Sequence, residues 1–194
     1  MGHVGIGGLC GLAWAGGLRS FMAALVGPDS QVTWVNTMIW ILLVGAIVGA
    51  LLGDAAWRCS AGRPWPALTC APLLFAGVLL PGLLHPTTMF DGGIGGGAIG
   101  VPLLGMAGAY ALAGQRTWAR VLCGSLFLAG MTLWVVVADD VGGSGFALDT
   151  ARGLWATLLY LCLLATLALA ATLPLRASAN PLVPAPGGIV GHHG

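Results

Sequence analysis

Arg19 is the residue whose type and position have the clearest chemical consequence. It lies inside the apolar stretch GGLRSFMAAL. An arginine at the centre of a membrane helix costs about 2.5–3.5 kcal/mol, so it indicates a functional site unless headgroups or a carboxylate satisfy it. Two structural roles are open, extension to lipid headgroups and an ion pair with Asp139 or Asp140. The functional role is contact with an anionic substrate or a lipid phosphate.

Asp54 is the second charged residue in an apolar stretch, WILLVGAIVGALLGDA. Arg58 follows four residues later, and on a helix this spacing favours a local ion pair. A carboxylate within a membrane helix is otherwise a candidate for relaying protons or cations. The local pair is the favoured interpretation.

The stretch GGIGGGAIGVPLLG spells a Gly-x-Gly-x-x-Gly motif at Gly95, Gly97 and Gly100. A dinucleotide site needs a strand before such glycines and an acid about 20 residues after them. Neither is present, so the match is accidental. Pro102 removes a backbone donor and predicts a kink in its helix. Gly-rich, Pro-interrupted helices also form the substrate sites of transporters.

Other reactive side chains form no recognisable site. The cysteines show no C-x-x-C spacing and no histidine partners, and free cysteines in apolar runs behave as small hydrophobes. No serine, histidine and acid set can be assembled at one depth. We therefore predict no enzyme activity, no cofactor and no metal. The five cysteines are Cys10, Cys59, Cys70, Cys123 and Cys162.

The elements that position these residues follow from the composition. Of 194 residues, 58% are hydrophobic and 7% are charged, whereas soluble domains average about 25% charged residues. Such a chain cannot cover a globule with polar groups, so the lipid bilayer is its predicted solvent. It has no basic run, and we predict no nucleic-acid partner.

Six apolar segments are long enough to cross a bilayer, which requires about 20 residues. They predict an all-α polytopic membrane helix bundle over residues 1–176. The tail, 177–194, is rich in proline and glycine and is predicted to be disordered. An alternative threading merges or drops one segment, and the short third segment is the first candidate. The six segments are 4–26, 35–57, 67–84, 92–114, 118–138 and 151–173.

The charges divide between the two sides of this threading. Loops rich in arginine stay cytoplasmic, which predicts a multi-pass protein of the inner (plasma) membrane with both termini in the cytoplasm. The opposite side carries most of the acids and Arg152. The arginines predicted to be cytoplasmic are Arg58, Arg63, Arg116, Arg120 and Arg176; the acids opposite are Asp29, Asp91, Asp139, Asp140 and Asp149.

Small residues repeat every four positions in three of the segments. On a helix this spacing places them on one face, where a neighbouring helix can approach closely. Packing within one chain is the favoured interpretation, and assembly with a second copy stays open. The three stripes are Gly7, Gly11 and Ala15; Gly45, Gly49 and Gly53; and Gly92, Gly96 and Gly100.

Several stretches in order, among them GGLRSFMAALVG, WILLVGAIVGALLGDA and ARGLWATLLYLCLLATLALAATLPLR, resemble a family of multi-pass membrane proteins from actinobacteria. The resemblance implies a membrane location and that source, and it assigns no activity.

Two functions remain as hypotheses. The first is a non-enzymatic accessory or structural subunit of a membrane complex, with the bilayer and other membrane subunits or a second copy as partners. The second is a small transporter or channel for an anionic or lipid-like solute that uses Arg19 and a kink at Pro102.

Overall fold

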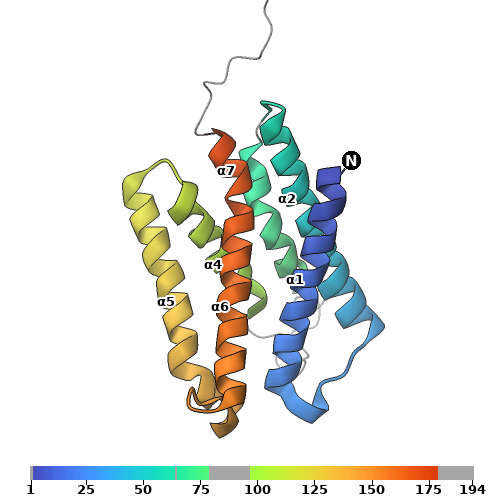
Figure 1. Cartoon of the computed structure of the whole chain (residues 1–194), viewed down its shortest axis with the longest axis vertical. Coiled ribbons are helices and arrows are strands. Elements are labelled where there is room, and N and C mark those ends of the chain that lie inside the picture. Colours follow the sequence, from blue (N-terminus) through green and yellow to red (C-terminus); the bar gives the residue numbers. More distant parts are fainter. Residues whose placement is uncertain (1, 64, 79–96, 179–194) are drawn as a thin grey trace, which may run out of the picture.

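The protein is a bundle of helices (Figure 1). The structure, a computed structural model, describes residues 2–63, 65–78 and 97–178, and no strand occurs in this part of the chain. Short 3-10 turns, Gly27–Asp29 and Ser144–Phe146 (η5), occupy two of the connections. The main elements are α1 (Gly2–Val26), a π-helix η2 (Trp34–Leu43), α2 (Val44–Ser60), a 3-10 helix η3 (Pro66–Val78), α4 (Gly97–Ala113), α5 (Thr117–Gly142), α6 (Ala151–Ala171) and α7 (Leu173–Ser178).

Four helical stretches are long and apolar enough to cross a membrane: Gly2–Val26, Trp34–Ser60, Thr117–Gly142 and Ala151–Arg176. They correspond to four of the six predicted segments.

The other two predicted segments coincide with the shorter helices η3 and α4. At 2.0 Å per residue the 13 residues of η3 span about 26 Å, and at 1.5 Å the 17 residues of α4 span about 25 Å. Both are shorter than the hydrocarbon core of about 30 Å, and residues 79–96 between them lie outside the described part. Six crossings therefore remain a prediction.

Turn and cap residues mark the helix boundaries, and they lie in the gaps between the predicted segments. Gly27 and Gly143 adopt φ values of 72° and 76°, which favour glycine because it has no Cβ. The side chain of Thr33 accepts a hydrogen bond from the Asn36 backbone N–H at the start of η2. Thr150 does the same for α6 with the backbone N–H of Gly153. Such caps satisfy amides that lack a partner within the helix.

Glycines bring α1 and α2 into backbone contact. A Cβ atom added to Gly11 would collide with the carbonyl oxygen of Gly45, and one on Gly49 would collide with that of Gly7. Gly53 lies equally close to the carbonyl oxygen of His3 near the start of α1. The small-residue faces of the two helices therefore pack on each other within one chain, in the geometry that small-xxx-small spacing favours.

The third predicted glycine stripe differs from the first two in its contacts with neighbouring helices. Gly92 and Gly96 lie outside the described residues, and no described atom lies within 4 Å of a Cβ built on Gly100. Contact instead occurs further along α4. A Cβ on Gly105 would lie 2.6 Å from Cδ2 of Leu167, and one on Gly108 would lie 2.7 Å from Cβ of Ala168. These later glycines pack α4 against α6.

Aromatic side chains join α1, α5 and α6. The ring of Phe21 lies 5.0 Å from Trp134 and 5.6 Å from Tyr160, and the last two rings are 5.1 Å apart. Tilted and edge-on pairs at these distances are favourable beyond the area they bury. Elsewhere, a second cluster of Val48, Leu52, Ala71 and Phe75 joins α2 to η3.

Charged side chains are distributed unequally between the two ends of the bundle. The α2–η3 connection, the α4–α5 connection and α7 lie at one end, together with the N-terminus (Figure 1). We call this the arginine end, because five arginines lie in these segments or in the helical turns next to them. The α1–η2 and α5–α6 connections lie at the other end, with Asp139, Asp140 and Asp149. The arginines are Arg58, Arg63, Arg116, Arg120 and Arg176.

Candidate functional site

Arg19 binds its own chain at the C-terminal part of α1. One of its terminal nitrogens donates a hydrogen bond to the backbone oxygen of Gln31 at 2.7 Å, and its Nε donates to Oγ1 of Thr37 at 3.4 Å. Thr37 is buried, and its hydroxyl also accepts from the backbone N–H of Thr33. The guanidinium therefore fastens α1 to the following connection and to η2.

The acids considered as partners of Arg19 lie elsewhere. Asp139 and Asp140 are exposed near the end of α5, where Oδ1 of Asp139 accepts from the backbone N–H of Asp140 at 3.1 Å. Within the described residues the structure contains one ion pair, between Asp54 and Arg58. Arg19 therefore does not pair with these two aspartates; it donates hydrogen bonds to a carbonyl of the adjacent connection and to a hydroxyl of η2.

Asp54 forms the local pair that the spacing favoured. Its Oδ2 lies 2.5 Å from Nε of Arg58, and both side chains are partly exposed. The Arg58 guanidinium also lies 5.5 Å from the ring centroid of Trp65, within the range of a cation–π contact. This cluster connects the end of α2 to the start of η3 and satisfies the carboxylate locally.

Two further arginines have roles that the sequence analysis missed. Nε of Arg120 donates to the oxygen of Ala111 at 3.0 Å, and a terminal nitrogen of Arg152 donates to the oxygen of Ala24 at 2.5 Å. These carbonyls belong to the last turns of α4 and α1, which lack partners within the helix. Arg152 also lies 4.7 Å from the ring of Phe146.

A signal for these contacts was present in the sequence. Arg120 and Arg152 both occupy the first turn of their own helices, where the helix dipole disfavours a cation. An arginine in that place needs an acceptor outside its helix. The C-terminal carbonyls of a neighbouring helix provide one, with a favourable dipole.

Pro102 lies within an uninterrupted helix. The α-helical conformation of α4 runs from Gly97 to Ala113 through Pro102, and the proline is fully buried. The hydrogen bonds of Arg19 go to Gln31 and Thr37, not to α4. The structure therefore does not bring Arg19 and Pro102 together as one site.

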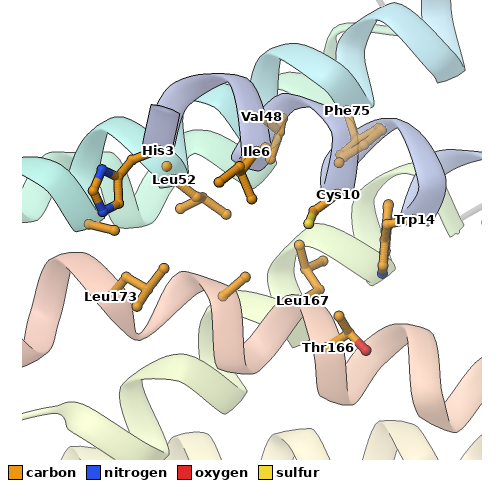
Figure 2. A pocket seen from close by; sticks show the side chains of 17 residues that line it. His3, Ile6, Cys10, Trp14, Val48, Leu52, Phe75, Thr166, Leu167 and Leu173 are labelled. Atoms are coloured by element: carbon orange, nitrogen blue, oxygen red, sulfur yellow. The ribbon is translucent and has the colours of Figure 1, made fainter. Parts of the chain in front are cut away.

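In the described part of the chain, a groove of about 290 Å³ lies between α1 and α6 (Figure 2). We call it the α1–α6 groove. Its lining is apolar apart from a few side chains, and α2 and η3 form its floor. The two walls carry Ile6 and Cys10 on α1 and Thr166 and Leu167 on α6, and the floor carries Val48 and Phe75.

The two ends of this groove differ. At one end Nε1 of Trp14 donates to the backbone oxygen of Leu163 at 2.8 Å, which joins α1 to α6. The Trp14 ring also packs on Phe75, with centroids 5.4 Å apart. At the other end His3 and Leu173 face each other across the opening (Figure 2). The groove is thus closed by an aromatic pair and open toward the arginine end.

A second hollow of about 250 Å³ lies at the arginine end, lined by Tyr110, Gln115, Arg116 and Leu175 among others. Among residues 2–63, 65–78 and 97–178, no group of three histidine, cysteine or acidic residues has the geometry of a metal site. The hydrogen bonds that join separate elements come from Trp14, Arg19, Arg120 and Arg152 among others.

Comparison with known proteins adds no relative from which a function could be transferred. No protein-family model matches this sequence. No curated protein and no solved structure matches it significantly.

Proposed function

We propose that this protein is a non-enzymatic, multi-pass protein of the plasma membrane that acts as an accessory or structural subunit of a membrane complex. The use of its polar side chains supports this role. Arg19, Arg120 and Arg152 donate to backbone carbonyls of other elements. Polar groups that bind the chain itself are suited to holding helices together.

The main observation behind this proposal is an exposed face of α5. Ser125, Ala129 and Thr132 are exposed small residues near the middle of this helix, and their spacing places them on one face. In the same chain, small residues at such spacing bring α1 and α2 into contact. We propose that the α5 face, defined by these three residues, binds a transmembrane helix of a partner subunit, because small residues allow close approach of helices in lipid.

The exposure of α5 also favours a partner. It is the least buried of the four long apolar helices. The three small side chains of the α5 face are flanked by large exposed ones such as Leu126 and Leu128. Small residues between large ones suit the packing of a second helix by ridges into grooves.

Localisation and orientation are part of the proposal. The five arginines at one end of the bundle support a cytoplasmic position for that end, by the positive-inside rule. The N-terminus and α7 lie there as well (Figure 1). Both termini are then cytoplasmic, as the sequence predicts.

The transporter hypothesis has less support. It requires Arg19 to be available to a solute and α4 to be broken near Pro102. The donors of Arg19 are directed at Gln31 and Thr37, and α4 is continuous through a buried Pro102.

The test compares two tryptophan substitutions on α5. The tagged full chain is purified from its native membrane in a mild detergent, and co-purifying membrane proteins are quantified by mass spectrometry. We expect a stoichiometric partner that Ala129→Trp reduces at least tenfold. Val141→Trp is the control, since residue 141 lies about 120° around the helix from Ala129 and is 62% exposed.

Two outcomes contradict the proposal. If the wild-type chain purifies alone, or if both substitutions reduce the partner equally, the α5 face is not a subunit interface. If a second copy of this chain alone binds through Ala129, self-assembly replaces the accessory role.

A further inference from the structure

The length of the α1–α6 groove matches the thickness of one membrane leaflet. It extends along α1 from His3 to Trp14, and at 1.5 Å per residue this stretch is about 16 Å long. The hydrocarbon core of a bilayer is about 30 Å thick, so a single leaflet contributes about half of that. A groove that begins at the arginine end and is closed at Trp14 therefore matches the length of the chains in the adjacent leaflet.

The groove also opens sideways onto an apolar surface. Ile6 on one rim is 64% exposed, and Cys10, Thr166 and Leu173 are exposed too. Neighbouring exposed side chains such as Leu9 are apolar as well. A hydrocarbon chain can therefore enter from the bilayer without crossing a polar barrier.

The volume of the α1–α6 groove determines what kind of molecule fits in it. A volume of about 290 Å³ is about twice that of an apolar cavity of about 150 Å³ that holds one benzene molecule. That space accommodates a slender chain of about ten heavy-atom groups. A helix with its side chains is about 10–12 Å across and does not fit. The glycine contact of α1 with α2 fixes the floor, so the groove cannot deepen by separating those two helices.

The positive charge of Arg176 near the open end of the groove favours one class of lipid headgroup. Leu173 borders the opening, and Arg176 follows three residues later on α7, a spacing that places the two side chains on neighbouring parts of one face. Arg176 is exposed. His3 lines the opening from α1. Arginine binds phosphate oxygens through a fork of N–H donors, which favours an anionic phospholipid over a zwitterionic one.

We propose that the α1–α6 groove binds one acyl chain of an anionic bilayer phospholipid, with the lipid phosphate near Arg176. The chain lies between Cys10 and Leu167, and its end approaches Trp14. This inference goes beyond the proposed subunit role and does not require the α5 face.

The test uses photoreactive lipids and the full chain in vesicles. Phosphatidylglycerol with a diazirine in the middle of one acyl chain is added at low mole fraction to phosphatidylcholine vesicles, and adducts are mapped by mass spectrometry after illumination. We expect adducts at Cys10 and Leu167 to exceed those at Leu133 on exposed α5 at least fivefold. Photoreactive phosphatidylcholine should label the groove several-fold less, and Arg176→Gln should remove that difference.

Two cysteine substitutions provide a matched pair. Cys10→Phe places a ring in the groove and should lower its labelling at least fivefold. Cys162→Phe makes the same change at an exposed cysteine of α6 that does not line the groove, and labelling should persist. Thr166→Phe fills the groove from the other wall and gives an independent variant if Cys10→Phe does not fold.

The inference is overturned by labelling that is uniform over the exposed helices, or by groove labelling that neither ring substitution lowers. Equal labelling of the groove by phosphatidylglycerol and phosphatidylcholine contradicts the preference for an anionic headgroup.

Discussion

The indole N–H of Trp14 in α1 donates a hydrogen bond to the backbone carbonyl oxygen of Leu163 in α6, at 2.8 Å. The two residues are 149 positions apart in the chain. A second polar link between the same helices, from Arg152 to the oxygen of Ala24, lies at the end opposite the arginine end. Between Trp14 and the arginine end the two helices are separated by the α1–α6 groove (Figure 2).

Replacing Trp14 by phenylalanine should weaken the junction of α1 and α6. The ring still packs on Phe75, but the hydrogen bond to Leu163 is lost, at a cost of about 1 kcal/mol. For a chain of this size that cost lowers the melting temperature by about 2–4 °C, measured in detergent. Trp57→Phe, at a residue that is 46% exposed, should leave it unchanged. An equal shift in both variants contradicts a specific role for the bond.

Two glycines of α1 offer the same substitution with opposite expectations. Gly11→Ala drives a methyl group into the carbonyl oxygen of Gly45, whereas a Cβ on Gly16 has no described atom within 4 Å. We expect Gly11→Ala to destabilise the fold by about 1–3 kcal/mol, as overpacking does. Gly16→Ala should be neutral or stabilising by up to about 1 kcal/mol, since alanine is the better helix former. Unfolding in mixed detergents measures both, and a neutral Gly11→Ala is the contrary result.

The sequence was sufficient for features that depend on one helix or on a repeating pattern. Its apolar segments located the four long helices. The four-residue period of Gly45 and Gly49 indicated a helix face for close packing. The spacing of four residues between Asp54 and Arg58 indicated their ion pair. Each of these inferences needs only the geometry of a single helix.

Other features depend on backbone positions that leave no residue-type signal. Arg19 binds the carbonyl oxygen of Gln31, and every residue type carries such a group. The groove depends on the distance between α1 and α6, which no local pattern encodes. The 3-10 geometry of η3 likewise departs from the α-helix that its apolar pattern favours, and Pro72 within it removes one backbone donor.

Arg19→Lys tests whether the arginine has a structural role. A lysine keeps the charge but is a single flexible point donor, whereas arginine reaches Gln31 and Thr37 with a planar fork. We expect a loss of about 1–2 kcal/mol of unfolding free energy. Thr37→Val should cost about as much, and the double variant should cost less than the sum, because the two residues share one interaction. Additive losses contradict the shared interaction. Arg176→Lys, at an exposed residue, is the control.

The charge separation of the bundle predicts its orientation. Reporter fusions after Arg63, Arg116 and Arg176 should all report the cytoplasm, and a reporter inserted at Asp149 should report the opposite side. The three arginines lie in elements gathered at one end (Figure 1). A fusion at one of the three that reports the opposite side contradicts both the six-span threading and the common orientation.

The contact between α1 and α2 determines what holds these helices together. In the membrane location that we propose, lipid tails are as apolar as leucine, so no hydrophobic driving force favours this contact over solvation by lipid. Because Gly7 and Gly49 each lie against the carbonyl oxygen of the opposite helix, their Cα–H groups can form weak C–H···O hydrogen bonds, worth about 0.5–1 kcal/mol each. These bonds involve only the backbone and no rotatable side chain, so the pair associates without loss of rotamer entropy. The α1–α2 pair can therefore assemble within the bilayer as one unit and serve as a rigid hairpin on which the later helices dock.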